Sequence, residues 1–159
     1  MYLRVIACEV LAREVYLAAA TSPHIVDVEL VAKGLHETPE DLRAELQRRI
    51  DAVEGGKYDA VILAYGLCGN STQGLMARSK PVVLVRAHDC ITLYLGSRER
   101  YRAEFVEHPG TYYYSDDYVE RSALSSAGSF AALGATADRM LKRLTGNTSS
   151  AMVRITLGI

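Results

Sequence analysis

Three cysteines, each placed just after an apolar run, are the residues of this sequence with the clearest chemical potential: Cys8, Cys68 and Cys90. The runs that precede them are typical of strands and cover residues 3–7, 60–64 and 82–86. The carboxyl ends of parallel strands meet at one edge of a sheet, where open α/β sheets place their ligand sites. The sequence therefore predicts a cluster of three thiols at that edge.

Three thiols with a histidine nearby form a set of ligands for a soft metal. His88 lies two residues before Cys90, and residues i and i+2 of an extended chain point the same way. With His88 as fourth ligand, the set would complete a tetrahedral zinc site. If His88 only hydrogen-bonds to a ligand, the fourth position is open for water or a substrate. A [4Fe-4S]-type cluster on Cys8, Cys68 and Cys90, with one iron free, fits equally well. The choice between zinc and a cluster stays open.

Polar and glycine-rich segments beside the cysteines supply further candidates. Glu9 and Asp89 adjoin Cys8 and Cys90, and we expect them to act as acid–base groups. Backbone amides and arginines are predicted to hold an anionic part of a substrate, at Gly66, Gly69, Asn70, Arg86, Ser97 and Arg98. A tight turn also explains the glycines without any ligand. Its N–H groups would still face the thiols.

Other interpretations of the cysteines remain open. Free cysteine is among the most buried residue types and often only packs. Cys68, near the start of a predicted short helix over residues 70–76, could instead be a metal-free nucleophile with a lowered pKa. A third alternative is a non-catalytic accessory protein that holds a ligand for a partner enzyme. The sequence does not decide whether the protein is an enzyme.

The composition excludes several classes of function. The 159 residues carry a net charge of −1, which provides no basic field for nucleic acid. No apolar run reaches the length of a membrane span, and no secretory signal precedes the first strand. We therefore expect a cytoplasmic protein with reduced thiols and a small-molecule substrate. The tyrosines over residues 112–118 favour strand packing or a homo-oligomer contact.

Strand and helix signals alternate along the chain. Thr38 and Pro39 are typical of a helix start, and apolar residues at helical spacing continue from them to residue 54. The run at 25–31 alternates between apolar and acidic residues, as expected for an edge strand with one wet face. We predict strands at 2–7, 25–31, 59–65, 81–85, 112–114 and 152–157, and helices at 9–20, 38–54, 70–76, 91–107 with a break near Gly96, and 129–144.

This alternation predicts a single α/β domain over residues 1–159, with a mostly parallel sheet. Strand order 2-1-3-4 puts the alternating strand at an edge, and the apolar strands at 59–65 and 81–85 are expected to be buried. The expected fold is a flavodoxin-like or Rossmann-like three-layer sandwich with an extra C-terminal strand. This order places the three cysteines on adjacent strand ends.

Several motifs resemble one known family. They are residues 5–14 (VIACEVLARE), 34–39 (GLHETP), 65–70 (YGLCGN), 86–92 (RAHDCIT), 96–101 (GSRERY) and 109–113 (PGTYY). These segments resemble the DUF1638 family, a domain of unassigned function, over about residues 3 to 114. The resemblance implies that all three cysteines belong to family motifs. Family members are typical of anaerobes and methylotrophs beside corrinoid methyltransferase components, which implies such partners and a small thiol or methyl donor as substrate.

Overall fold

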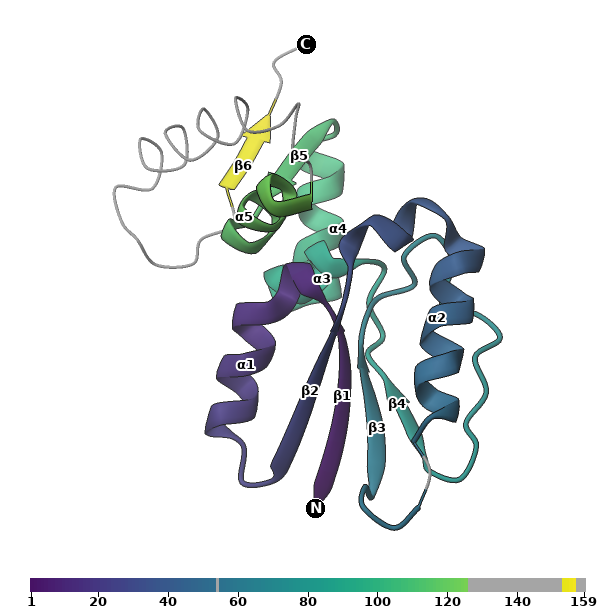
Figure 1. Ribbon diagram of the computed structural model, residues 1–159. Helices are drawn as coiled ribbons and strands as arrows, with labels where there is room; N and C mark the ends of the chain where they lie inside the picture. Colours follow the sequence, from purple (N-terminus) through teal and green to yellow (C-terminus); the bar gives the residue numbers. More distant parts are fainter. Residues whose placement is uncertain (54, 126–152, 157–159) are drawn as a thin grey trace. The chain divides into compact units, whose positions relative to one another are not determined.

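The computed structural model describes residues 1–53, 55–125 and 153–156, which fall into two compact units (Figure 1). The first unit comprises Met1–Leu93 and the second Tyr94–Ile159. All three cysteines belong to the first unit. Among the described residues, no helix combines the length and apolar character needed to cross a membrane.

A four-stranded parallel sheet forms the centre of the first unit. Its order is β2-β1-β3-β4, with β1 at Tyr2–Cys8, β2 at Ile25–Val31, β3 at Ala60–Ala64 and β4 at Val82–Leu84. In the register, Cys8 pairs with Val31 and Ala7 pairs with Ala64. The predicted order is confirmed, and β1, β3 and β4 are neighbours whose carboxyl ends lie at one edge.

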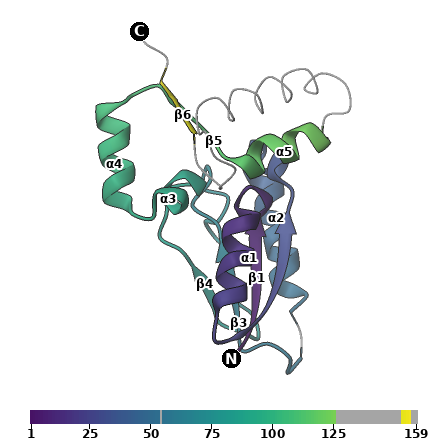
Figure 2. The same ribbon diagram turned by 90° about the vertical axis from the view of Figure 1, so that its left-hand side faces the viewer.

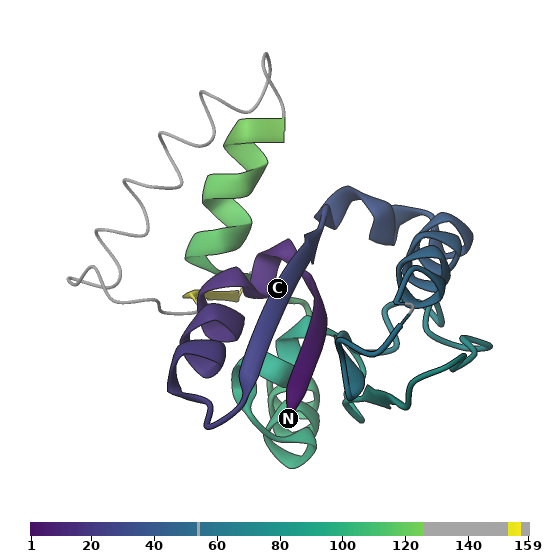
Figure 3. The ribbon, with the colours of Figure 1, turned by 60° about the horizontal axis from the view of Figure 1, so that its bottom comes forward.

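Two helices cover opposite faces of this sheet (Figures 1 and 3). After a 3-10 turn at Glu9–Leu11, helix α1 spans Ala12–Thr21, and α2 spans Pro39–Asp51 after a second 3-10 turn at Lys33–Glu37. Pro39 suits the first turn of α2, where a missing N–H costs nothing. The buried side of α2 carries Leu42, Leu46 and Ile50 at helical spacing. The flavodoxin-like or Rossmann-like architecture is thereby confirmed.

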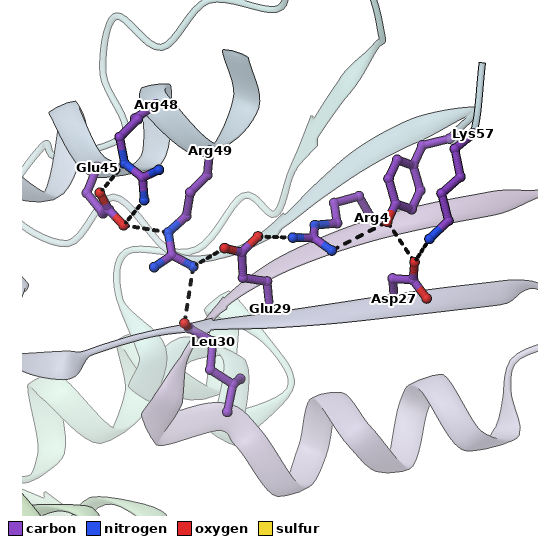
Figure 4. Close-up of polar contacts among 9 residues, drawn as sticks. Arg4, Asp27, Glu29, Leu30, Glu45, Arg48, Arg49 and Lys57 are labelled. Atoms are coloured by element: carbon purple, nitrogen blue, oxygen red, sulfur yellow. Dashed lines mark hydrogen bonds and ion pairs between the residues drawn. The ribbon is translucent and has the colours of Figure 1, made fainter. Parts of the chain in front are cut away.

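A network of charged side chains joins the α2 face of the sheet to the helix (Figure 4). Glu29 of β2 binds Arg4 of β1 on one side and Arg49 of α2 on the other, with an Nη1–Oε1 distance of 2.6 Å. Arg49 also donates to Glu45 at 2.6 Å, and Glu45 binds Arg48. We call these five residues the charge network. They explain why an edge strand carries acidic residues on a face that a helix covers.

The structure contradicts the prediction that the apolar run at 81–85 forms a buried strand. Strand β4 is short, pairs with β3 alone in the described sheet, and leaves Val83 52% exposed. The prediction of burial was wrong because an unbroken apolar run does not distinguish a central strand from an edge strand. The expected helix at 70–76 was also wrong, since this segment forms turns.

The second unit combines helices with a small antiparallel sheet. Helix α3 (Cys90–Leu95) crosses the unit boundary, and α4 (Arg98–Glu107) begins after Ser97, whose Oγ accepts a hydrogen bond from the Arg100 N–H. Strands β5 (Thr111–Tyr114) and β6 (Val153–Thr156) pair side by side (Figure 2). Helix α5 (Asp116–Ser125) was not predicted. The helix predicted at 129–144 lies outside the described residues.

Candidate functional site

Three free thiols lie at or beyond the carboxyl ends of β1, β3 and β4, which are neighbours in the sheet. Cys8 is the last residue of β1, Cys68 lies in the loop after β3, and Cys90 begins α3 after β4. Cys8 is buried, whereas Cys68 and Cys90 are partly exposed. We call these three residues the thiol edge.

Two loops of the thiol edge are held together by backbone hydrogen bonds. The Leu67 N–H donates to the Ala87 carbonyl at 3.0 Å, and the Cys68 N–H donates to the His88 carbonyl at 3.1 Å. A Cβ at Gly66 would lie 2.6 Å from the Asp89 backbone. Only glycine permits this approach, which brings Cys68 beside the chain that leads into Cys90.

The loop that carries Cys68 adopts an unusual conformation. Cys68, Gly69 and Asn70 have φ angles of 44°, 68° and 67°, in the left-handed region. Glycine and asparagine adopt this region readily, but cysteine does so at a cost. The buried Ser71 hydroxyl donates to the Cys68 carbonyl, and Arg43 of α2 donates to the Asn70 carbonyl at 3.0 Å. The surrounding structure thus holds Cys68 in a strained position.

The pKa values of all three thiols are raised, and the first cause for each is the loss of solvent around the sulfur, which acts even at the partly exposed Cys68 and Cys90. The pKa of Cys68 rises to about 11, through burial first and then through the neighbouring Cys8 and Asp89. Burial raises the pKa of Cys90 to about 12, with Cys8 and Cys68 as further causes. Burial also raises the pKa of Cys8. The thiols are therefore protonated at neutral pH. Cys8 acts electrostatically on both Cys68 and Cys90, and Cys68 acts on Cys90.

Tyr65 lies next to Cys8 on the α2 face of the sheet. The β1–β3 ladder ends at the pair Ala7 and Ala64. Beside the larger effect of burial, a side-chain hydrogen bond between the Tyr65 hydroxyl and Cys8 lowers the pKa of Cys8 and raises that of Tyr65. Tyr65 is only 2% exposed, and no nitrogen or oxygen atom of the described residues forms a hydrogen bond with its hydroxyl. Burial raises the pKa of Tyr65 further, and the thiols of Cys8 and Cys68 are the next causes. The site thus contains a buried hydroxyl with thiols for neighbours.

An acid and a base flank Cys8 at the same edge. Glu9 Oε1 accepts a hydrogen bond from the Lys33 N–H at 2.9 Å, which ties the end of β1 to the segment after β2. Burial lowers the pKa of Lys33, while Glu9 and Cys8 act in the opposite direction. The positive charge of Lys33 in turn lowers the pKa of Cys8. The Glu9 carboxylate raises the pKa of Cys8 by more than Lys33 lowers it, so the pair leaves the protonated thiol favoured.

The sequence matches a known family over residues 30–154, and the description of that family is "Protein of unknown function (DUF1638)". The chain belongs to the DUF1638 family. The matched region contains Cys68 and Cys90, and Cys8 precedes it. No curated protein and no solved structure matches the sequence.

In this DUF1638 protein, His88 and Asp89 bind each other. His88 is 68% exposed in its side chain, and its Nδ1 lies 2.9 Å from Asp89 Oδ2. Asp89 Oδ1 accepts the Thr92 N–H at 3.1 Å and so caps α3. Cys90 is already helical, so the extended spacing from which we expected His88 and Cys90 to point the same way ends before Cys90. Asp89 remains close enough to the thiols to raise the pKa of Cys90.

The predicted anion-binding residues divide between the two units. Gly66, Gly69 and Asn70 lie in the Cys68 loop, and Arg86 is exposed just before the His88 segment. Ser97 and Arg98 belong to the second unit, where Ser97 caps α4. The first unit thus brings together the cysteines, the glycine-rich loop, Glu9 and Asp89.

Two residues that lie near the cysteines, Tyr65 and Lys33, were not identified from the sequence. Tyr65 continues the alternation of β3, because Leu63 and Tyr65 lie on the same face; that period was the available signal. Lys33 carried no such signal, since its position depends on β2 lying beside β1. Within the described chain, no group of three His, Cys, Asp or Glu side chains is already arranged to hold a metal ion. The three thiols match in type the ligands of a thiolate-bound metal.

Proposed function

We propose that this protein binds a metal ion or an iron–sulfur cluster through Cys8, Cys68 and Cys90. The proposal is supported by the position of the three thiols at or beyond the carboxyl ends of the neighbouring strands β1, β3 and β4, and by the effect of Cys8 on the pKa values of both Cys68 and Cys90. Thiolates are the preferred ligands of zinc and of iron–sulfur clusters.

Burial alone is a weaker explanation of this arrangement. A cysteine that only packs has no need of a left-handed backbone, yet Cys68 has a φ of 44°. Unfavourable backbone conformations cost about 1–3 kcal/mol each and are concentrated at functional sites. The close contact of Gly66 with Asp89 also serves to bring the Cys68 and Cys90 segments together.

The raised pKa values favour a metal site over a metal-free cysteine nucleophile. A reactive cysteine needs a lowered pKa, because the thiolate is the nucleophile. Here burial raises the pKa of Cys68 to about 11. A bound metal would overcome this penalty, since metal binding drives the proton from a coordinating thiol.

The proposed activity follows from an open coordination position. When bound, the metal or cluster would supply a Lewis acid for a small thiol or methyl donor. Cys8, Cys68 and Cys90 would hold it. Glu9 and Asp89 are the acid–base candidates, and His88 is either a fourth ligand or a hydrogen-bonding neighbour.

Metal and sulfide analysis of anaerobically purified protein tests the proposal. We expect about one zinc per chain, or iron with acid-labile sulfide and a brown colour. Cys8→Ser, Cys68→Ser and Cys90→Ser should each lower the metal content severalfold. Thr72→Ser is the matched control, because Thr72 is buried in the loop that follows Cys68 and carries no thiol. Wild-type protein that stays metal-free after reconstitution, or cysteine variants with undiminished metal, would contradict the proposal.

A further inference from the structure

Strand β4 is an edge strand whose side chains are all apolar (Figure 1). It pairs with β3 alone, and no strand of the described residues lies on its other side. Val83 and Leu84 are 52% and 37% exposed, and Val85, which follows the strand, is 41% exposed. Natural proteins usually protect such an edge with a charged residue, a proline or a bulge. Val82–Leu84 contains no charged residue and no proline, so this edge is open to pairing.

The exposed side chains lie on both faces of the sheet. Successive side chains of a strand alternate between the two faces, so Val83 and Val85 lie on one face and Leu84 lies on the other. A helix packed on one face would cover only one of these groups. A further strand beside β4 would contact both groups, because a neighbouring strand has side chains on both faces. The exposure of these residues therefore fits pairing with a strand better than packing against a helix.

The outer side of β4 also carries backbone groups that can bind a strand. The Val61 N–H of β3 donates to the Pro81 carbonyl at 2.9 Å, just before β4 begins. Backbone groups of a strand turn alternately to its two sides, so Pro81 and Val83 turn their carbonyls toward β3. Val82 and Leu84 therefore turn their N–H and C=O groups to the outer side. These are the groups to which an added strand would bind.

We propose that β4 is a dimerisation edge, which pairs antiparallel with β4 of a second copy of this chain about a two-fold axis. Such an axis keeps corresponding faces of the two sheets on the same side, so one residue must lie opposite its own copy. Pairing centred on Val83 would set Lys80 opposite Arg86, and like charges in that position destabilise a sheet. Pairing centred on Leu84 avoids this contact and sets Val83 opposite Val85. The charges therefore select the register centred on Leu84.

In this register the segment is complementary to itself, which is why a second copy is the partner. Leu84 meets its own copy, and Val83 of each copy meets Val85 of the other, so all three exposed side chains gain apolar neighbours. Because few residues are paired, the interface is small, and a small interface gives a weak, reversible dimer. None of the paired residues belongs to the thiol edge, so the dimer does not depend on the metal site.

Sedimentation velocity of the reduced full chain at increasing concentration tests the dimer. We expect the wild-type sedimentation coefficient to rise toward that of a dimer, with a dissociation constant between about 1 µM and 1 mM. Leu84→Lys should abolish the rise, because two like charges would face each other across the axis. Leu17→Lys is the matched control, since Leu17 is 67% exposed on α1, and it should leave the rise unchanged. Equal effects of the two variants would overturn the proposal, and so would a wild-type chain that stays monomeric up to about 1 mM because another of its own segments covers β4.

Disulfide trapping with oxidised glutathione tests the register. The two Leu84 residues would form a hydrogen-bonded pair with Cα atoms about 5.5 Å apart, which a disulfide can bridge. The two Val83 residues would lie on a diagonal of about 7–8 Å, which is too long. Leu84→Cys should therefore give a covalent dimer joined through the introduced thiols, well above the background from the three native cysteines of the wild type, and Val83→Cys should not. The reverse order, or no covalent dimer above background in either variant, would overturn the proposed pairing.

Discussion

The charge network and the thiol edge lie in the same unit, yet their polar groups have different kinds of partners. In the network, Glu29 meets Arg4 and Arg49, and Arg49 also reaches Glu45 and the Leu30 carbonyl. At the thiol edge, the Tyr65 hydroxyl meets only thiols. The network consists of paired opposite charges, whereas the thiol edge consists of protonated thiols and a buried hydroxyl.

The largest expected effect concerns the pH dependence of metal binding at the thiol edge. Each bound thiol must lose its proton, so affinity should rise about 10-fold per pH unit for each thiolate formed, or about 1000-fold for three. The pKa values of Cys68 and Cys90, about 11 and 12, keep both thiols protonated over the accessible range. The rise should therefore continue beyond pH 9. Competition titrations with a chelator of known protonation would measure it.

A slope below 10-fold per pH unit would show that fewer than one proton leaves on binding, and the three-thiolate site would then be wrong. Flattening of the affinity near pH 8.5, where an ordinary free thiol ionises, would show that the thiols are less perturbed than their burial implies.

The charge network should respond to a change in its central carboxylate with a loss of stability alone. Glu29→Gln keeps the size of the side chain but removes the negative charge shared by two partly buried arginines. We expect a loss of about 1–2 kcal/mol in the free energy of unfolding of the metal-free protein, measured in urea. Co²⁺ affinity should not change.

Glu40→Gln is the matched control for this change. Glu40 is exposed in the first turn of α2, where its charge is worth only a few tenths of a kcal/mol. Equal losses of unfolding free energy in Glu29→Gln and Glu40→Gln would show that the charge network stabilises the protein no more than an exposed charge does. A loss of Co²⁺ affinity in Glu29→Gln would mean that the two regions are coupled.

The smallest expected effect is a difference in stability between two substitutions of Cys68. This difference separates backbone strain from the loss of the thiol. Both Cys68→Ala and Cys68→Gly remove the thiol, but only glycine adopts a φ of 44° without steric cost. We therefore expect the glycine variant to be more stable than the alanine variant by about 1 kcal/mol in urea unfolding of metal-free protein. The opposite order would show that the loop relaxes once the thiol is gone.

Much of the architecture was predictable from local patterns. The alternation of acidic and apolar residues at 25–31 placed β2 at an edge, and Pro39 with its helical apolar spacing placed α2. The predicted break near Gly96 is confirmed, because α3 ends at Leu95 and α4 begins at Arg98. These features depend on residues that are close in sequence, so their physical cause can be read there.

The apolar run at 81–85 shows that a local sequence pattern does not predict how deeply a strand is buried. Hydrophobicity favours a strand, but whether a strand is central or at an edge depends on which other strands pair with it. β4 pairs with β3 alone in the described sheet, and its side chains are more exposed than the run suggested. The prediction that His88 and Cys90 point the same way met the same difficulty. It assumed an extended chain, but α3 begins at Cys90.

By itself, the sequence determined which chemistry is available: three thiols, each after a predicted strand, in a chain with no charge excess. Only the tertiary structure decided what surrounds them. The close contact of Gly66 with Asp89, the positive φ of Cys68 and the enclosure of the Tyr65 hydroxyl each depend on segments brought together by folding. The physical reason is that residue type sets which bonds a group can make. Burial and long-range pairing decide which of those bonds the folded chain leaves unmade.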